Sequence, residues 1–428
     1  MHSKAVKPAQ RVVLVSLYYW PEKAGSAPPV QQMAEVLAAA GHQIEVLTAR
    51  PAYPEMAVYP AYRDGSQDRE QHQGVTIERI PQASYQPGGG LRSRLATESR
   101  FALRAWWRLI RRPRADVVIA VCPSILAVLA VRLACSGKTT RRLAVVHDLQ
   151  SGLAKSLGIA RQPRIARLIE GLERRALQPM ARIVTLSESM AQSIRNLGIT
   201  VPISIVPPTV DDDLIRPQPE QSGTPRLLYS GNIGRKQGLD QLIDLAGVLQ
   251  QRGLEATLII RGDGNYRETL ERHAKARALT HLRFEPLCPA DRLAEGLAEG
   301  HIHLVPQDPA GAAFAVPSKI YSIMAAGRPF VCTAEPGSPL EALRAESDAF
   351  VTCPPNQPAS FAELIERLIA DPAERARLGR NGRAYVEQHA GRNAAARAYG
   401  ELIAEPPGAV SADAGVDKHS DPGFSRHP

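Results

Sequence analysis

Three short stretches of the chain combine glycine with basic or hydroxyl side chains, and each follows an apolar run. The first, YSGNIGRKQGLD, contains Gly231, Gly234, Arg235, Lys236 and Gly238. Glycine lets the backbone approach a ligand closely, and the start of the following helix supplies free N–H groups. The basic pair adds full positive charge. This pattern favours binding of an anion, above all a diphosphate; the alternative is a solvated basic turn.

The other two stretches have the same order of apolar run, small-residue loop and helix. In RGDGNYRETLE the turn is formed by Gly262, Asp263 and Gly264, a combination that also closes ordinary strand-to-helix loops. In PSKIYSIMAAG we expect Ser318 to cap a helix and donate to a phosphate, which Lys319 would neutralise. Loops at the carboxyl ends of parallel strands open into one crevice, where ligands bind.

Apolar runs alternate with helical patterns along the chain, which predicts an α/β protein with parallel sheets covered on both faces. In the first half the predicted strands are 12–17, 44–48, 76–80, 117–121, 143–146 and 183–186, and the helices include 30–40 and 163–177. In the second half the predicted strands are 227–230, 256–261, 282–285, 302–305 and 330–333, and the helices are 239–250, 267–277 and 318–326.

The length of 428 residues favours two domains. Residues 207–226 contain five prolines and few apolar side chains, so we predict a linker there. It would join an N-terminal domain, 10–206, to a C-terminal domain, 227–370. The pattern of 371–404 predicts C-terminal helices, and 405–428 is poor enough in large apolar residues to predict a disordered tail.

The charge balance restricts the partners. The chain has 52 Lys and Arg against 43 Asp and Glu, a formal charge of +9, which favours anionic partners. An aromatic content of 5% argues against nucleic acid. Five scattered cysteines without a C-x-x-C pair predict reduced thiols and a cytoplasmic location. The longest apolar stretch, 117–135, is interrupted by Pro123 and charged by Arg132, so we expect no membrane span.

The segment between Arg92 and Arg114 has eight arginines in a helical pattern. Its predicted basic face carries Arg100, Arg104, Arg108 and Arg111. Its predicted apolar face carries Leu95, Ala102, Leu103, Trp106 and Ile110, with Trp107 beside them. A basic amphipathic helix with tryptophan suits the surface of an anionic membrane. The alternative is a helix whose tryptophans pack on the domain and whose arginines are solvated.

Jointly the motifs resemble a family-4 retaining glycosyltransferase of the GT-B fold, and the colanic-acid and exopolysaccharide biosynthesis glycosyltransferases are most similar. The resemblance covers roughly residues 10–400 and rests on YYWPEKAGSAPPV, VVHDLQ, RIVTLSESM, YSGNIGRKQGLD, RGDGNYRETLE and PSKIYSIMAAGRPFV. It implies two Rossmann-like parallel-sheet domains facing a cleft, with a nucleotide-sugar donor in the C-terminal domain and an acceptor in the N-terminal domain.

The resemblance also implies roles for residues of the C-terminal domain. Arg235, Lys236 and Lys319 would stabilise the charge that builds on the leaving nucleoside diphosphate, without a metal or a further cofactor. The residues expected to bind the nucleotide sugar are Gly231, Asn232, Gly234, Gly262, Asp263, Ser318, Lys319 and Ser322.

In the N-terminal domain, the resemblance places the loop with Gly25 and Ser26 at the cleft, where it would not bind a dinucleotide; the alternative is a tight turn. In VVHDLQ, Asp148 would orient an acceptor hydroxyl and His147 would contact the sugar. The alternative is a helix-capping aspartate beside a packed histidine.

The sequence departs from the family pattern at several positions. Phe314 and Ser322 stand where the family usually has two glutamates, which puts contacts to the donor sugar and the ribose in doubt. Asn232 and Gln237 occupy the usual arginine and lysine positions. The run VDDDL at 210–214 resembles the D-x-D of metal-dependent enzymes, but no strand precedes it, so we expect helix capping or solvated charge.

We therefore expect a metal-independent, hexosyltransferase-type enzyme at the inner face of the plasma membrane. It would transfer sugar to a lipid-linked or saccharide acceptor in surface or exopolysaccharide biosynthesis. One alternative is a nucleotide-sugar 2-epimerase, which shares the fold but needs a set of carboxylates that is not evident around the loops. The other is a non-catalytic scaffold that binds nucleotide sugars, for which the missing glutamates are the main support.

Overall fold

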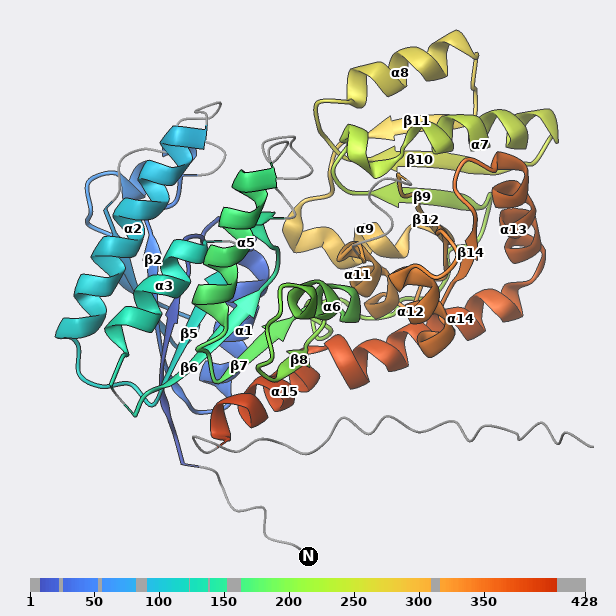
Figure 1. Cartoon of the computed structure of the whole chain (residues 1–428). Coiled ribbons are helices and arrows are strands. Elements are labelled where there is room, and N and C mark those ends of the chain that lie inside the picture. The colour runs from blue at the N-terminus through green and yellow to red at the C-terminus, as the bar shows by residue number, and fades with distance from the viewer. Residues whose placement is uncertain are drawn as a thin grey trace, which may run out of the picture.

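The structure is a computed structural model that describes residues 8–22, 26–52, 56–81, 91–122, 124–137, 139–151, 163–308 and 316–405. Each half of the chain forms one sheet with helices against it (Figure 1). The predicted α/β class with two parallel-sheet domains is confirmed.

The first sheet has eight strands in the order β3-β4-β2-β1-β5-β6-β7-β8. They are β1 (Arg11–Val15), β2 (Gln43–Ala49), β3 (Arg69–His72), β4 (Val75–Ile80), β5 (Val117–Cys122), β6 (Arg141–Val146), β7 (Arg182–Thr185) and β8 (Ile203–Ile205). All neighbours pair in parallel except β3 with β4. The central strands are buried on both faces, which explains their unbroken apolar runs.

Two layers of helices cover this sheet. The helices of the first half are α1 (Ala27–Ala39), α2 (Leu91–Arg111), α3 (Ile125–Ala134), α5 (Pro163–Leu177) and α6 (Glu188–Asn196). Alternate residues of β1 face opposite layers: Val13 and Val15 pack with α2, α3 and α5, whereas Val12 and Leu14 pack with α1. α2, α3 and α5 therefore lie side by side on one face of the sheet (Figure 1).

The second sheet has six parallel strands in the order β11-β10-β9-β12-β13-β14. They are β9 (Arg226–Ser230), β10 (Thr257–Arg261), β11 (Leu282–Glu285), β12 (Ile302–Val305), β13 (Phe330–Thr333) and β14 (Val351–Cys353). The helices around it are α7 (Asp240–Gln251), α8 (Arg267–Ala276), α9 (Leu293–Ala298), α11 (Lys319–Ala325), α12 (Pro339–Ser347), α13 (Pro358–Ala370) and α14 (Pro372–Tyr385).

In both sheets the strand order reverses beside the first strand of the half. β1 lies between β2 and β5, and β9 lies between β10 and β12. Open α/β sheets bind ligands at the carboxyl ends of the strands where this reversal occurs. The arrowheads of β9, β10 and β11 point towards the first half of the chain (Figure 1). The loops after β9 and β12 therefore lie at the expected binding edge.

The structure matches the predicted strands closely. Those at 282–285, 302–305 and 330–333 coincide with β11, β12 and β13, and the others differ at their ends by at most two residues. β3, β8 and β14 were not predicted from the sequence. β3 reads REQH and pairs antiparallel at the sheet edge, and β8 and β14 have three residues each, so none of them gives a long apolar run.

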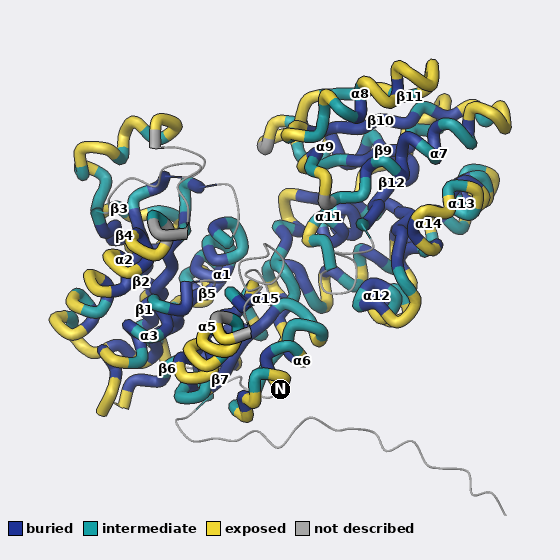
Figure 2. Tube along the Cα trace, turned by 45° about the horizontal axis from the view of Figure 1, so that its top comes forward, coloured by how far each residue is buried: buried dark blue, intermediate teal, exposed yellow. Residues whose placement is uncertain are grey.

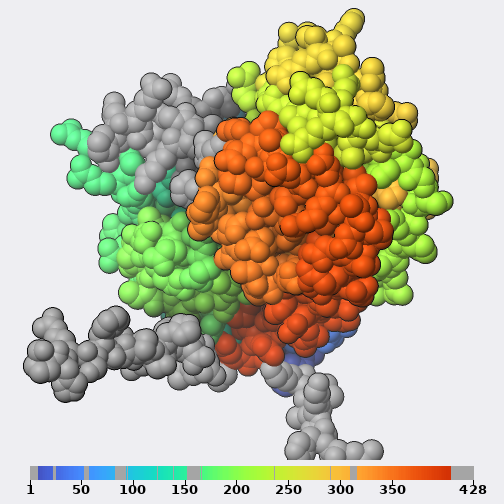
Figure 3. Space-filling model, turned by 90° about the vertical axis from the view of Figure 1, so that its right-hand side faces the viewer, coloured from blue at the N-terminus to red at the C-terminus, as the bar shows by residue number. Residues whose placement is uncertain are grey.

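The segment predicted as helical at 371–404 is divided between the two halves. α14 packs on α11 and α13, a π-helical turn follows at Val386–Ala390, and α15 (Arg392–Ala404) packs on α1 in the first half. Tyr399 and Leu402 of α15 belong to the core of the first half. Figure 3 shows this end of the chain, in dark red, against green and blue segments of the first half.

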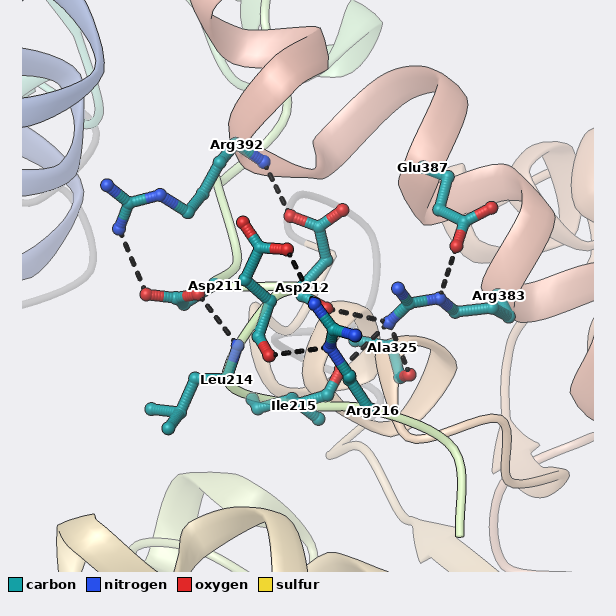
Figure 4. Close-up of polar contacts among 10 residues, drawn as sticks. Asp211, Asp212, Leu214, Ile215, Arg216, Ala325, Arg383, Glu387 and Arg392 are labelled. Carbon is teal, nitrogen blue, oxygen red and sulfur yellow. Dashed lines mark hydrogen bonds and ion pairs between the residues drawn. The ribbon is translucent and has the colours of Figure 1, made fainter. Parts of the chain in front are cut away.

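The chain passes between the halves twice, and the two passages are tied together (Figure 4). The N–H of Val210 donates to the carbonyl of Ala390 (2.9 Å). The Asp212 carboxylate accepts the N–H of Arg392 at the start of α15 (2.8 Å). A Cβ on Gly391 would lie 2.4 Å from that carboxylate, so a glycine is needed there.

Arg383 of α14 adds a second tie between the passages. Its guanidinium donates to the carbonyls of Asp212 (3.0 Å), Ile215 (2.8 Å) and Ala325 (3.1 Å). Asp211 pairs with Arg392 (3.0 Å). No helix begins at the VDDDL run: Asp212 instead accepts from the distant start of α15, and Asp213 is exposed, in line with solvated charge, the second of the two expected roles.

We predict that Asp212→Ala lowers the free energy of unfolding by about 1 kcal/mol, because the start of α15 loses its acceptor. Asp213→Ala is the matched control: this carboxylate is exposed and pairs with an exposed Arg216, so its removal should cost less than about 0.5 kcal/mol. Urea denaturation followed by circular dichroism measures both. Equal effects of the two substitutions would contradict the capping role.

Candidate functional site

Lys319, at the start of α11, lies beside the glycine loop that follows β9. Its Nζ is 3.8 Å from the centre of the Tyr229 ring. A Cβ built on Gly231 would lie 3.9 Å from the aliphatic part of the lysine side chain. The Tyr229 hydroxyl donates to the carbonyl of Asn232 (2.7 Å), which holds the ring beside the loop. The structure therefore brings the first and third of the predicted stretches together.

The loop after β10 packs directly against the loop after β9. The N–H of Ile233 donates to the carbonyl of Asp263 (2.8 Å). A Cβ on Gly262 would lie 1.9 Å from the carbonyl oxygen of Gly231, and one on Gly264 would lie 2.2 Å from that of Ile233. Only glycine permits so close an approach of two backbones. The glycines of the second stretch are thus required to join the two loops.

Gly238 joins the same loop to the end of β12. Its backbone is left-handed (φ +66°), and a Cβ would lie 2.7 Å from the backbone nitrogen of Asp308. Buried Gln241 donates to the carbonyls of Gly238 (3.2 Å) and Gln307 (2.9 Å) and accepts the N–H of Asn356 (2.9 Å). We did not predict Gln241, because a glutamine in the first turn of an amphipathic helix resembles a solvent-facing residue.

Polar and charged side chains lie around these joined loops. Arg235 is exposed, and its guanidinium carbon lies 5.3 Å from the centre of the Tyr266 ring. Gly234 precedes the short helical turn Arg235–Gln237. The side chain of Lys236 lies outside the described residues. Exposed at the same edge are Asn232, Asp263 and Ser318. One predicted contact is wrong: Ser318 does not cap α11 with its side chain, because its backbone is already helical (φ −58°, ψ −26°).

Lys319 is the most unusual ionisable group at this edge. Burial lowers the pKa of its ammonium to about 7. Among the residues that the structure describes, no carboxylate pairs with it, and the Tyr229 ring face is its nearest compensation. Ser322 lies half-buried on the same helix, and Phe314 lies outside the described residues. A site that lowers a lysine pKa in this way is prepared for an anionic ligand.

The predicted residues of the first half lie at the carboxyl end of β6. Asp148 is exposed and accepts the N–H of Leu149 (2.9 Å). His147 is half-buried, and burial lowers its pKa to about 4, so the ring is neutral near pH 7. Its Nδ1 is buried without a hydrogen-bond partner among the described residues. Ser26 precedes α1 without a capping hydrogen bond, and Gly25 lies outside the described residues.

The predicted division of α2 into a basic and an apolar face is wrong. Arg108 pairs with Glu78 of the sheet, so it points towards the domain and not away from it. Trp106 packs against the core, whereas Leu103 is 65% exposed and Trp107 is 46% exposed. Arg111 stacks on Trp107 at 3.9 Å from the ring centre. The outer surface of α2 therefore mixes apolar and basic side chains.

Comparisons with known proteins cover most of the chain. The glycosyl transferase 4-like domain matches residues 24–209, and the glycosyl transferases group 1 family matches residues 210–385. These two matches meet inside the predicted linker. WcaI of Escherichia coli (strain K12), named as a colanic acid biosynthesis glycosyl transferase, is 30% identical over 373 residues, which are 83% of this chain and 90% of that protein.

Two solved structures share the fold. Sucrose-phosphate synthase from Thermosynechococcus elongatus has a TM-score of 0.71 at 18% identity, and the likeness covers 92% of this chain and 98% of that one. HepE of Anabaena in complex with UDP has a TM-score of 0.68 at 13% identity, covering 92% and 99% of the two chains. At these identities the likeness shows the fold alone.

We predict that Lys319→Met changes stability in a pH-dependent way. The lysine pKa is about 7 in the folded protein and near 10.5 in the unfolded chain. The burial penalty is therefore full below pH 7 and falls as the pH rises towards 10.5. The difference in melting temperature, variant minus wild type, should therefore be larger at pH 6 than at pH 9. Lys275→Met, at an exposed position of α8, is the control. A difference that does not change with pH would contradict the lowered pKa.

Proposed function

The chain belongs to the glycosyl transferases of group 1, and we propose that it transfers a sugar, with retention of configuration, from a nucleotide-sugar donor to a lipid-linked saccharide during assembly of a surface polysaccharide. The observation that carries the proposal is the half-buried Lys319, which lies beside the Gly231 loop at the strand-order reversal of the second sheet and pairs with no carboxylate among the described residues. The resemblance read from the sequence is confirmed at the level of the family.

The chemistry follows from where charge develops. As the bond between the sugar C1 and the diphosphate oxygen breaks, negative charge grows on the diphosphate. The Lys319 ammonium and the Arg235 guanidinium would stabilise that charge, and the N–H groups at the joined loops would add to it. A diphosphate would also raise the pKa of Lys319, because it would supply a counter-charge. HepE of Anabaena, which shares the fold, was solved with UDP and with UDP-glucose, and this supports a nucleotide-sugar donor here.

The acceptor would bind at the carboxyl edge of the first sheet. A neutral His147 cannot act as a cation there, so it would contact a sugar hydroxyl by hydrogen bonding. Asp148 would orient the attacking hydroxyl. WcaI is named for colanic acid biosynthesis, and the similarity to it supports a saccharide acceptor in polysaccharide assembly.

The two alternatives read from the sequence have different support. The matching families and relatives are glycosyl transferases and give the 2-epimerase no support. A binding protein without transferase activity is favoured by one observation: Ser322 stands on α11 where the family usually has a glutamate. Transfer and binding are separated by the experiment on Asp148 below.

We also propose that the first half rests peripherally on an anionic membrane, at the inner face of the plasma membrane. Among the described residues, seven of the eleven exposed large apolar side chains lie on the neighbouring helices α2, α3 and α5. They are Leu95, Leu103, Trp107, Ile110, Leu133, Leu168 and Leu172. Exposed arginines on α2 and α5 include Arg100, Arg104, Arg111, Arg167 and Arg175.

This arrangement fits an interfacial surface because apolar side chains enter the lipid boundary while arginines contact anionic head groups. Exposed positions run along α2 and α5 in Figure 2. Of the arginines and tryptophans of this helix that were predicted to contact the membrane, Arg100, Arg104, Trp107 and Arg111 remain in the proposal. Trp106 and Arg108 leave it, because both contact the domain. None of the described helices has the length and apolar content needed to span a bilayer.

We predict that one nucleoside diphosphate class raises the melting temperature selectively, and that Asp148→Ala abolishes sugar transfer while this shift persists. A ligand at a hundredfold excess over its dissociation constant stabilises the folded state by about 2.7 kcal/mol. UDP, GDP, ADP and their sugars form the screen, and Asp213→Ala is the control for transfer. Full transfer activity in Asp148→Ala would refute the acceptor-site assignment; binding without transfer by the wild type would favour the scaffold.

We predict that Arg100→Glu combined with Arg104→Glu weakens binding to phosphatidylglycerol vesicles at least about tenfold, since each basic residue at an anionic surface contributes about 1 kcal/mol. Vesicle co-sedimentation measures this. Arg272→Glu on α8 with Arg277→Glu at the C-cap of α8, in the second half, makes the same change of charge elsewhere. A similar loss in both double variants would indicate non-specific attraction and would contradict the assigned surface.

A further inference from the structure

Two buried carboxylates converge on the segment that carries Asp148. Glu98 on α2 is 3% exposed, and Glu173 on α5 is 1% exposed. Both come from helices on the same face of the first sheet, and both reach the residues that follow β6. A carboxylate is costly to bury unless hydrogen bonds compensate it. The hydrogen bonds of the two glutamates therefore indicate their role.

Glu173 holds the backbone shortly after His147 and Asp148, the residues proposed to contact the sugar acceptor. Its Oε1 accepts the N–H of Ser151 (3.1 Å). Polar groups of Ser151 and Gln150 lower the pKa of this carboxylate. Burial nevertheless raises the pKa of Glu173. The Ser151 N–H thus anchors the backbone three positions after Asp148, and the second carboxylate oxygen of Glu173 is buried without a hydrogen-bond partner among the described residues.

Glu98 holds the same segment through a side chain. Its Oε2 accepts from the Gln150 amide (3.2 Å) and from the Ser124 hydroxyl (3.3 Å). Ser124 follows β5, the strand beside which the order of the first sheet reverses. Glu98 thus joins the ends of two neighbouring strands at the expected ligand-binding edge.

Cys122 shows that these groups share one small region with Asp148. The charges of Glu173, Glu98 and Asp148 all add to the burial that raises the pKa of the Cys122 thiol. The thiol is 3% exposed at the end of β5. It therefore reports on whether this region stays closed.

We propose that Glu98 and Glu173 are positioning residues that hold the segment 147–151 so that Asp148 presents its carboxylate to the acceptor. This inference rests on the proposed function only for the role of Asp148. The contacts of the two glutamates with Gln150 and Ser151 do not depend on it. Neither glutamate touches the reacting atoms in this proposal; each acts through Gln150 or Ser151. A displacement of about 1 Å at such a segment is enough to lower a catalytic rate up to about a hundredfold.

The decisive test exchanges the two partners of one hydrogen bond. In Gln150→Glu two carboxylates face each other, so the turnover number should fall at least about tenfold while the affinity for the nucleotide sugar is unchanged. In the double variant Glu98→Gln/Gln150→Glu an amide again faces a carboxylate. Its turnover number should recover to within about threefold of the turnover number of the single variant Glu98→Gln. Failure of the double variant to recover, at an unchanged melting temperature, would overturn the proposal.

A second pair covers the case in which Gln150→Glu does not fold. Glu173→Gln keeps one oxygen that can accept the Ser151 N–H and should retain most of the turnover; Glu173→Leu should lose it. Equal turnover in the two variants would overturn the proposal, because the hydrogen bonds would then have no positioning role.

The rate of Cys122 alkylation gives a readout that does not need transferase activity. N-ethylmaleimide labelling followed by mass spectrometry should be faster at Cys122 in Gln150→Glu and slow again in the double variant. Cys353, which is buried in the second half, is the internal reference. If no variant or wild type transfers sugar, the proposed function fails, and this labelling alone decides the holding role: unchanged Cys122 labelling overturns it.

Discussion

The site in the second half depends on a contact between two backbones that only glycine allows. The loop after β9 and the loop after β10 approach so closely that a Cβ on Gly262 would overlap the carbonyl of Gly231. This contact, with Gln241 bridging to the end of β12, joins three loops into one rigid edge. The Lys319 ammonium lies half-buried beside this edge, and among the described residues no carboxylate pairs with it.

The binding edges of the two sheets carry side chains of opposite charge. The edge of the second sheet places a cationic side chain without a described partner beside an exposed arginine, an environment suited to a diphosphate. The matching edge of the first sheet buries two glutamates that accept from hydroxyl, amide and N–H donors, and it leaves Asp148 exposed, an environment suited to a sugar hydroxyl. α15 and the Asp212 cap tie the halves together, while α2 carries Glu98 on its inner side and the proposed membrane surface on its outer side.

The sequence was most informative where burial on both faces imposes an unbroken apolar run. β12 and β13 were predicted to the residue for that reason, and the three glycine and lysine stretches indicated the anionic edge. It was uninformative where a polar residue is buried. Glu98, Glu173 and Gln241 occur in helices, where their pattern is that of a solvated face, and only the fold shows that their partners lie far away in the chain. The faces of α2 were wrong for a related reason: Glu78 draws Arg108 inwards, and no periodicity reveals such a pair.

The most direct test of the account is amide hydrogen exchange of the whole protein with and without UDP, GDP or ADP. We expect that one of these nucleotides slows exchange in three separate segments at once, 230–238, 262–266 and 316–321, because a single diphosphate contacts the joined loops. Protection confined to the first half, or no protection in these segments with any nucleotide, would contradict the assignment of the donor site.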